Sequence, residues 1–99
     1  MTIQKTLDDK KLTVSIEGRL DTLTAPELEE MLEPAMNGLE ALVIDLTDLA
    51  YISSAGLRVL VNAAQVMEAQ NGEMKVLNAN ADVRNIFDIT GLTDALGVE

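Results

Sequence analysis

The sequence predicts a small α/β domain, with a mixed sheet of about four strands, helices packed on it, and the order β-β-α-β-α-β-α. Three observations carry this prediction. The chain of 99 residues is long enough for one hydrophobic core, so residues 1–99 are expected to form a single domain. Apolar residues alternate with polar ones near the N-terminus and later recur at helical spacing. Strands separated by helices are typical of parallel pairing through right-handed crossovers.

The N-terminal segments predict an antiparallel hairpin. Residues 2–7 and 12–17 both alternate between apolar and polar side chains, and the polar stretch from Asp8 to Lys11 between them is turn-like. Gly18 follows the second alternating segment and is expected to end that strand.

The first helix is expected to begin at Thr24. Thr24 is a candidate N-cap, Pro26 lies in the first turn where its missing N–H does no harm, and Glu27 completes a capping box. The apolar residues that follow at helical spacing are Leu28, Met31, Leu32, Ala35 and Leu39. Pro34 interrupts this pattern, which predicts a kinked or shortened helix.

The second half of the chain predicts two strands and two helices. The run Ala41–Leu46 is apolar apart from one aspartate, which is typical of a strand buried on both faces. A helix is expected over 55–71, then a short strand over 74–77, and a third helix around 83–87 started by Asn80. The stripe expected to face the sheet from the second helix consists of Leu57, Leu60, Val61, Ala64 and Met67.

Composition excludes several classes of function. Seventeen acidic residues against seven basic ones give a net charge of −10, so no basic footprint exists for nucleic acid, and an anionic membrane would repel the chain. Cysteine and histidine are both absent, which excludes disulfides, zinc–thiolate sites and a Ser-His-Asp triad. No membrane span or secretion signal is visible, so we expect a cytoplasmic protein without metal or cofactor.

Three aspartates at strand ends are candidate catalytic residues. Asp45 and Asp48 flank the end of the buried strand, and Asp21 comes just after another strand. Carboxylates at strand ends can hold magnesium or act as an acid–base pair. The alternative is that they accept backbone N–H groups and shape turns. No glycine-rich phosphate loop accompanies them, so we expect no enzymatic activity.

Two serines lie between the buried strand and the long helix. Ser53 and Ser54 are followed by the small pair Ala55–Gly56. One of the serines can be the helix N-cap. One hydroxyl can also be exposed beside small residues that leave room for another protein, where the helix macrodipole favours an added phosphoryl group. The two interpretations are compatible, and the sequence leaves open which serine has which role.

Four motifs in order resemble the STAS domains of bacterial anti-sigma factor antagonists. They are Gly18–Asp21, Asp45–Leu60, Gly72–Leu77 and Ile86–Leu92, so the resemblance extends over nearly the whole chain. It implies a switch protein that binds an anti-sigma factor, usually a serine kinase, and so frees a sigma factor. Phosphorylation of a serine by that kinase stops binding, and a serine phosphatase restores it.

The resemblance also implies which residues form the site. By position the phosphorylated serine is Ser54, with Ser53 as the second choice, because Ser53 replaces the aspartate of the Asp-Ser-Ser/Thr-Gly motif and Ala55 replaces its second hydroxyl. The expected partner-binding residues are Asp21, Ser53, Ser54, Ala55, Gly56 and Arg58. An alternative within the same family is a structural subunit that binds the ATPase of a lipid-exporting ABC transporter, in which the serine loop serves packing.

Overall fold

The computed structural model describes all 99 residues and contains five strands and three helices. The strands are β1 (Thr2–Asp8), β2 (Lys11–Leu20), β3 (Ala41–Asp45), β4 (Leu49–Ile52) and β5 (Glu73–Leu77). The helices are α1 (Ala25–Ala35), α2 (Ser54–Ala69) and α3 (Ala81–Ile89). The predicted mixed α/β architecture is confirmed, and the strand that the sequence did not indicate is β4.

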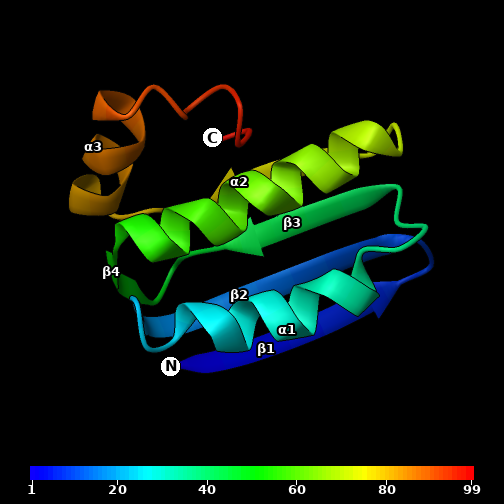
Figure 1. The fold of residues 1–99 in the computed structure, drawn as a ribbon, viewed down its shortest axis with the longest axis horizontal. Coiled ribbons are helices and arrows are strands. Elements are labelled where there is room, and N and C mark those ends of the chain that lie inside the picture. Colours follow the sequence, from blue (N-terminus) through cyan, green and yellow to red (C-terminus); the bar gives the residue numbers. More distant parts are fainter.

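The strands form one mixed sheet with the order β1-β2-β3-β5, and β4 pairs with β2 beyond the end of β3 (Figure 1). β1 and β2 are antiparallel, as the predicted hairpin requires, and all other pairs are parallel. The outer edge of β5 is covered by the C-terminal segment, in which Val98 forms a parallel bridge to Val76. This covering protects an edge that would otherwise present unpaired backbone groups.

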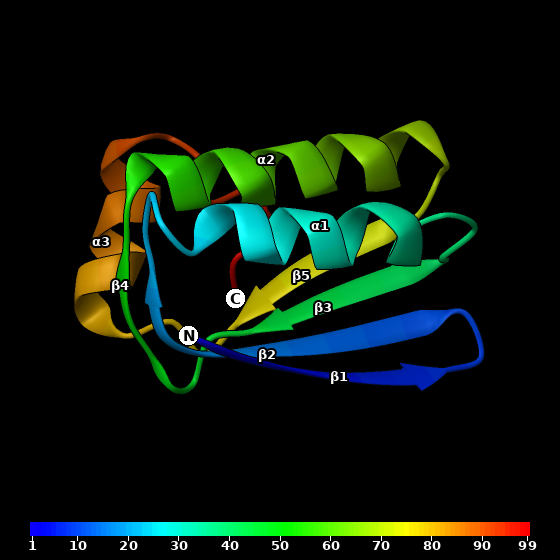
Figure 2. The same ribbon diagram turned by 60° about the horizontal axis from the view of Figure 1, so that its bottom comes forward.

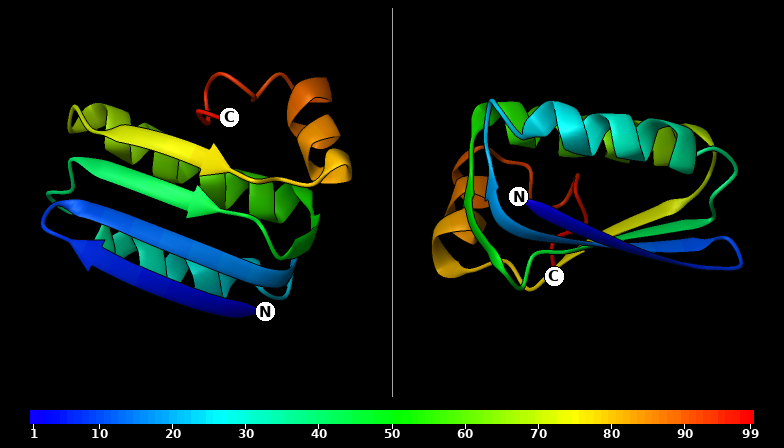
Figure 3. Two further views of the ribbon diagram at one scale, coloured as in Figure 1. Left: turned by 180° about the vertical axis from the view of Figure 1, so that it is seen from behind. Right: turned by 90° about the horizontal axis from the view of Figure 1, so that it is seen from below.

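β2 does not end at Gly18, so that prediction is wrong. Gly18 has a φ of 101°, and the register of β2 shifts between Gly18 and Arg19, which marks a bulge. Before the bulge β2 pairs with β3, and after it β2 pairs with β4. The strand therefore bends out of the sheet plane (Figure 3) and brings Arg19 and Leu20 beside β4.

α1 and α2 lie side by side on one face of the sheet, and α3 packs against β4 at one end of it (Figure 2). The buried sheet residues are Leu12, Val14, Ile16, Leu20, Leu42, Val43, Ile44, Leu49, Ile52 and Val76. No helix covers the opposite face (Figure 2), yet the successive residues Leu42, Val43 and Ile44 of β3 are all buried, so the predicted burial of this strand on both faces is confirmed. Val43 is only 9% exposed, because its neighbours in register are Thr13 and Lys75.

α1 begins without the predicted capping box. Thr24 occupies the N-cap position, but its side chain makes no cap hydrogen bond. Its hydroxyl instead donates to the backbone oxygen of Arg19 at 2.8 Å, so it is used in the loop before the helix. At the other end the helix stops at Ala35, directly after Pro34, which confirms the predicted shortening.

α2 packs on the sheet with a slightly different face from the predicted one. Its buried residues are Gly56, Val59, Leu60, Ala63 and Met67. Leu60 and Met67 were predicted correctly, whereas Leu57, Val61 and Ala64 are only partly buried. The reason is a close approach at Gly56, where an added Cβ would lie 2.7 Å from Leu20 Cγ. No helix is long and apolar enough to cross a lipid bilayer.

Candidate functional site

The candidate site forms where the end of β2, the end of β4 and the start of α2 meet. The Ser53 N–H donates to the Leu20 oxygen at 2.9 Å, and this bond joins the start of α2 to the bent end of β2. Asp21 follows Leu20 directly, so the loop 21–24 lies near the start of α2 (Figure 2). The structure therefore brings Asp21 to the same end of the molecule as Ser53 and Ser54.

The two serines have different surroundings. Ser53 has extended backbone angles (φ −99°, ψ 175°), and its Oγ accepts a hydrogen bond from the Gly56 N–H at 3.4 Å, so it is the N-cap of α2. Ser54 is the first helical residue, its side chain is exposed, and its hydroxyl makes no hydrogen bond within the chain. The question that the sequence left open is thus resolved in part: Ser53 caps the helix and the Ser54 hydroxyl is unengaged.

Ala55 and Gly56, the two small residues that follow the serines, are at least partly buried. Gly56 is buried, and an added Cβ would lie 3.0 Å from Ile52 Cγ1 as well as close to Leu20. Ala55 is half-buried. Gly56 is therefore explained by the close seating of α2 on β2 and β4, and Ser54 is the exposed member of this segment.

Asp21 fixes the loop between β2 and α1. Its Oδ1 accepts hydrogen bonds from the Leu23 and Thr24 N–H groups at 3.0 and 3.1 Å, and its own N–H donates to Thr24 Oγ1 at 2.8 Å. The bond from the Thr24 N–H is the main cause that holds the pKa of Asp21 below its ordinary value. Asp21 is therefore ionised at neutral pH, and it shapes the loop as the non-catalytic interpretation predicted.

The sequence analysis missed one contact of the site, the one between Arg19 and Tyr51. The Arg19 guanidinium lies 4.3 Å from the centre of the Tyr51 ring, and Arg19 Nε lies 3.8 Å from Asp21 Oδ2. Arg19 was indicated by its place in the Gly18–Asp21 motif, but its contact with Tyr51 exists only because β2 bends and pairs with β4. Arg58 is exposed one turn into α2 and takes part in none of the chain's ion pairs.

Asp45 has a structural explanation. Its Oδ1 accepts hydrogen bonds from the Thr47 hydroxyl at 2.6 Å, the Thr47 N–H at 3.0 Å and Asn78 Nδ2 at 3.2 Å. These bonds, that of the Thr47 hydroxyl first, lower the pKa of Asp45. The Asp48 backbone oxygen accepts from the Gly18 N–H at 3.0 Å and so supports the bulge. No group of three or more acidic side chains is arranged to hold a metal ion.

The surface around Ser54 is not hollowed. Several hollows occur elsewhere on the molecule, and none of them is lined by Asp21, Tyr51 or Ser54. Small-molecule sites are concave, whereas protein interfaces of ordinary size are broad and shallow. The arrangement therefore fits contact with another protein better than capture of a small ligand.

Fold and site together define a small domain with a mixed sheet, two helices on one face, and an unengaged serine at the start of the second helix. The family model of the STAS domain matches residues 2–99. The chain belongs to the STAS domain family.

Relatives within this family carry more specific names. The chain is similar to the anti-sigma-B factor antagonist of Staphylococcus aureus (strain NCTC 8325), with 32% identity over 99 residues that cover 99% of this chain and 92% of the relative. It is 34% identical to the anti-sigma-B factor antagonist of Bacillus subtilis (strain 168), over 92% of this chain and 84% of the relative. A crystal structure of an anti-sigma factor antagonist from Mycobacterium paratuberculosis superposes with a TM-score of 0.86 at 28% identity, over 98% of this chain and 83% of the other.

Proposed function

We propose that this protein is an anti-sigma factor antagonist that binds an anti-sigma factor with serine kinase activity and is switched off by phosphorylation of Ser54. The observation that carries the proposal is the exposed, unengaged hydroxyl of Ser54 at the start of α2, beside a neighbour that already caps the helix. The similarity to two anti-sigma-B factor antagonists across most of their length supports the same function. The protein is a binding partner and a substrate in the cytoplasm, and not itself an enzyme.

The modification is an ordinary phosphoryl transfer. Ser54 Oγ attacks the γ-phosphorus of ATP bound to the kinase, the bond from that phosphorus to the bridging oxygen breaks, and ADP leaves. The hydroxyl proton passes to a base of the kinase. A serine phosphatase reverses the modification with water, which yields inorganic phosphate and restores the hydroxyl.

The position of Ser54 allows a phosphate without loss of the fold. Ser54 is not needed as a cap, and the positive end of the α2 macrodipole lies at this residue. Phosphate adds about −1.5 to −2 charges and three acceptor oxygens at pH 7. In a protein interface this group adds bulk and a desolvation cost, and a loss of roughly 3–4 kcal/mol weakens binding a few hundred-fold.

Intact-mass measurement identifies the modified serine. The parent, Ser54→Ala and Ser53→Ala are each incubated with ATP and the anti-sigma factor kinase of the same organism. We expect the parent and Ser53→Ala to gain one phosphate and Ser54→Ala to gain none, because only Ser54 presents a free hydroxyl. A phosphate gained by Ser54→Ala contradicts the assignment.

Binding of the same kinase without ATP tests the role of the site. Ser54→Ala is expected to bind as the parent does, and Ser54→Asp is expected to bind weakly while it stays folded, because a carboxylate is tolerated in the first helical turn. Equal affinity of Ser54→Asp and the parent opposes the proposal. The proposal is also contradicted if the parent protein binds the ATPase of a lipid-exporting transporter and binds no anti-sigma factor.

A further inference from the structure

Leu23 is the most exposed large apolar side chain of the protein, with 89% of its surface accessible. A single exposed leucine is common on protein surfaces and needs no function by itself. Two further features distinguish Leu23 from Leu7, Val66 and Ile89: the hydrogen bonds that hold its loop, and the position of that loop near the start of α2.

The loop that carries Leu23 is held by hydrogen bonds on both sides. The Leu23 N–H donates to Asp21 Oδ1 at 3.0 Å, and the Ala25 N–H donates to the Asp21 oxygen at 2.8 Å. The Thr24 hydroxyl ties the same loop to the Arg19 oxygen at 2.8 Å. Because the backbone is already ordered, contact through Leu23 avoids most of the entropy that a flexible loop loses on binding.

The loop lies beside the start of α2, and Figures 2 and 3 agree on this placement. The Ser53 N–H is bonded to the oxygen of Leu20, three residues before Leu23. Tyr51, 39% exposed, and the Arg19 guanidinium above its ring belong to the same end of the molecule. Arginine and tyrosine are the residue types enriched at the energetic centres of protein interfaces.

We infer that Leu23 is the apolar anchor of this interface and enters an apolar pocket of the anti-sigma factor next to Ser54. The inference rests on the proposed function and adds the chemistry of the partner's surface. Arg19 and Asp21 are polar residues close to the anchor, as is usual around a desolvated interface centre. A phosphate on Ser54 introduces charge beside this desolvated contact, which explains why one modification weakens the whole interface.

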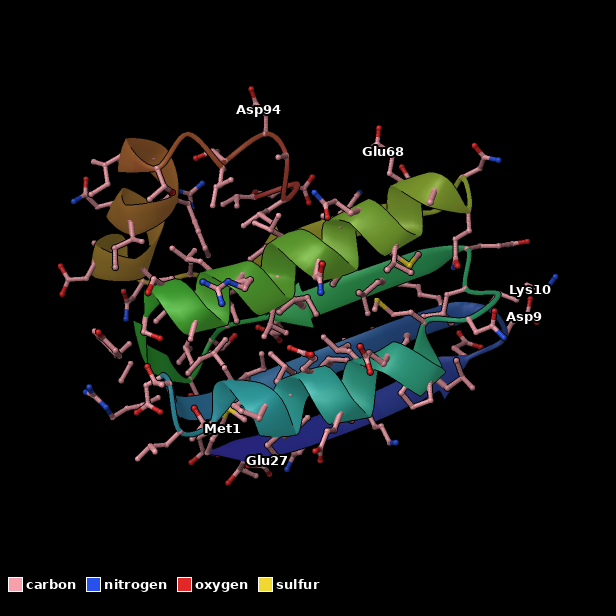
Figure 4. The ribbon with its side chains drawn as sticks, in the orientation of Figure 1. Met1, Asp9, Lys10, Glu27, Glu68 and Asp94 are labelled. Atoms are coloured by element: carbon pink, nitrogen blue, oxygen red, sulfur yellow. The ribbon has the colours of Figure 1, made fainter.

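The test compares two leucines with the same substitution. Leu23→Ala removes the anchor, and Leu7→Ala removes a leucine that is 64% exposed in β1, just before the hairpin turn. The turn residues Asp9 and Lys10 lie at the opposite end of the molecule from the start of α2 (Figure 4). Affinity for the purified anti-sigma factor kinase is measured by calorimetry, and the thermal midpoint of each variant is recorded.

We expect Leu23→Ala to weaken binding about 30-fold or more, and Leu7→Ala to change it less than about threefold. Both thermal midpoints should stay close to that of the parent, since neither side chain is in the core. Leu23→Met, which keeps an apolar side chain of similar volume, should retain most of the affinity. Leu23→Ala binding within about threefold of the parent overturns the inference.

The same titrations separate this inference from the proposed function. If Ser54→Asp binds like the parent, the phosphorylation switch fails, while the comparison of Leu23→Ala with Leu7→Ala still reports on the anchor. If Ser54→Asp binds weakly and Leu23→Ala binds normally, the switch stands and the anchor is wrong.

Discussion

Ser53 and Ser54 are adjacent in sequence, yet their backbone conformations differ and so do the surroundings of their hydroxyl groups. Ser53 is extended and turns its hydroxyl toward the Gly56 N–H, whereas Ser54 is already helical and exposes its hydroxyl. A phosphate on Ser53 would remove a cap, and a phosphate on Ser54 leaves the cap in place. This difference at the scale of single residues is what makes Ser54 suited to a reversible modification.

Stability measurements on the two serines test this division directly. Ser53→Ala should lower the free energy of unfolding by about 0.5–2 kcal/mol, toward the lower end because the cap bond is 3.4 Å long. Ser54→Ala should change it by less than about 0.5 kcal/mol, since its hydroxyl has no partner to lose. Urea unfolding of both variants gives the two values, and a larger loss for Ser54→Ala contradicts the assignment of the cap.

Asp45 gives a prediction for acid stability. Its hydrogen bonds to Thr47 and Asn78 lower its pKa in the folded state below the value of 3.8 for a free side chain. The resulting stabilisation is fully present above about pH 5 and is lost progressively as the pH falls through the folded-state pKa. The Asp45→Asn variant has no carboxylate at this position and therefore lacks this pH-dependent stabilisation. The difference in unfolding free energy between parent and variant should therefore narrow from pH 7 to about pH 2, as urea titrations at each pH can show; a constant or widening difference speaks against it.

At the scale of elements, α2 depends on a small number of buried residues. Leu60 lies at the centre of the face that packs on the sheet and is fully buried. Leu60→Ala should cost about 2–5 kcal/mol, a large share of the 5–15 kcal/mol typical of a domain. Val66→Ala, on the same helix but 40% exposed, is the matched control and should cost much less. Chemical denaturation measures both, and equal losses would show that the helix face is misassigned.

The hairpin and the three helices were predictable because their apolar spacing is long enough to be periodic. β4 was not, since four residues carry little pattern and this strand has a partner only because β2 bends at the Gly18 bulge. The buried face of α2 differs from the predicted face for a similar reason. Its position is set by the contact of Gly56 with Leu20, which joins residues distant in sequence.

In the candidate site, too, the features that depend on contacts between residues distant in sequence were not predictable. The motifs located Asp21 and the two serines, and local reasoning correctly proposed a cap and a free hydroxyl. The contact of Tyr51 with Arg19 and the exposure of Leu23 had no local signal in the sequence. The contact arises from the pairing of β4 with β2, and the exposure of Leu23 is a property of the folded loop 21–24. The Thr24 cap was predicted wrongly because the loop uses its hydroxyl for the Arg19 oxygen.

At the scale of the whole molecule, the residues of the proposed interface and the proposed switch lie at one end, where the bend of β2 at Gly18 brings them together. The pairing of β2 with β4 sets the start of α2 beside the loop 21–24. A phosphate at Ser54 would therefore lie within the proposed interface. The net charge of −10 adds long-range repulsion toward acidic partners and favours a partner with a basic contact surface.

The most direct measurement is the affinity of the anti-sigma factor kinase for three forms of this protein: unmodified, phosphorylated, and phosphorylated then treated with a serine phosphatase. Calorimetric titration without ATP, with intact mass recorded for each form, gives the dissociation constants. The account predicts that one phosphate on Ser54 weakens binding about a few hundred-fold and that phosphatase treatment restores the original affinity. Equal affinity of the kinase for the phosphorylated and unmodified forms would contradict it.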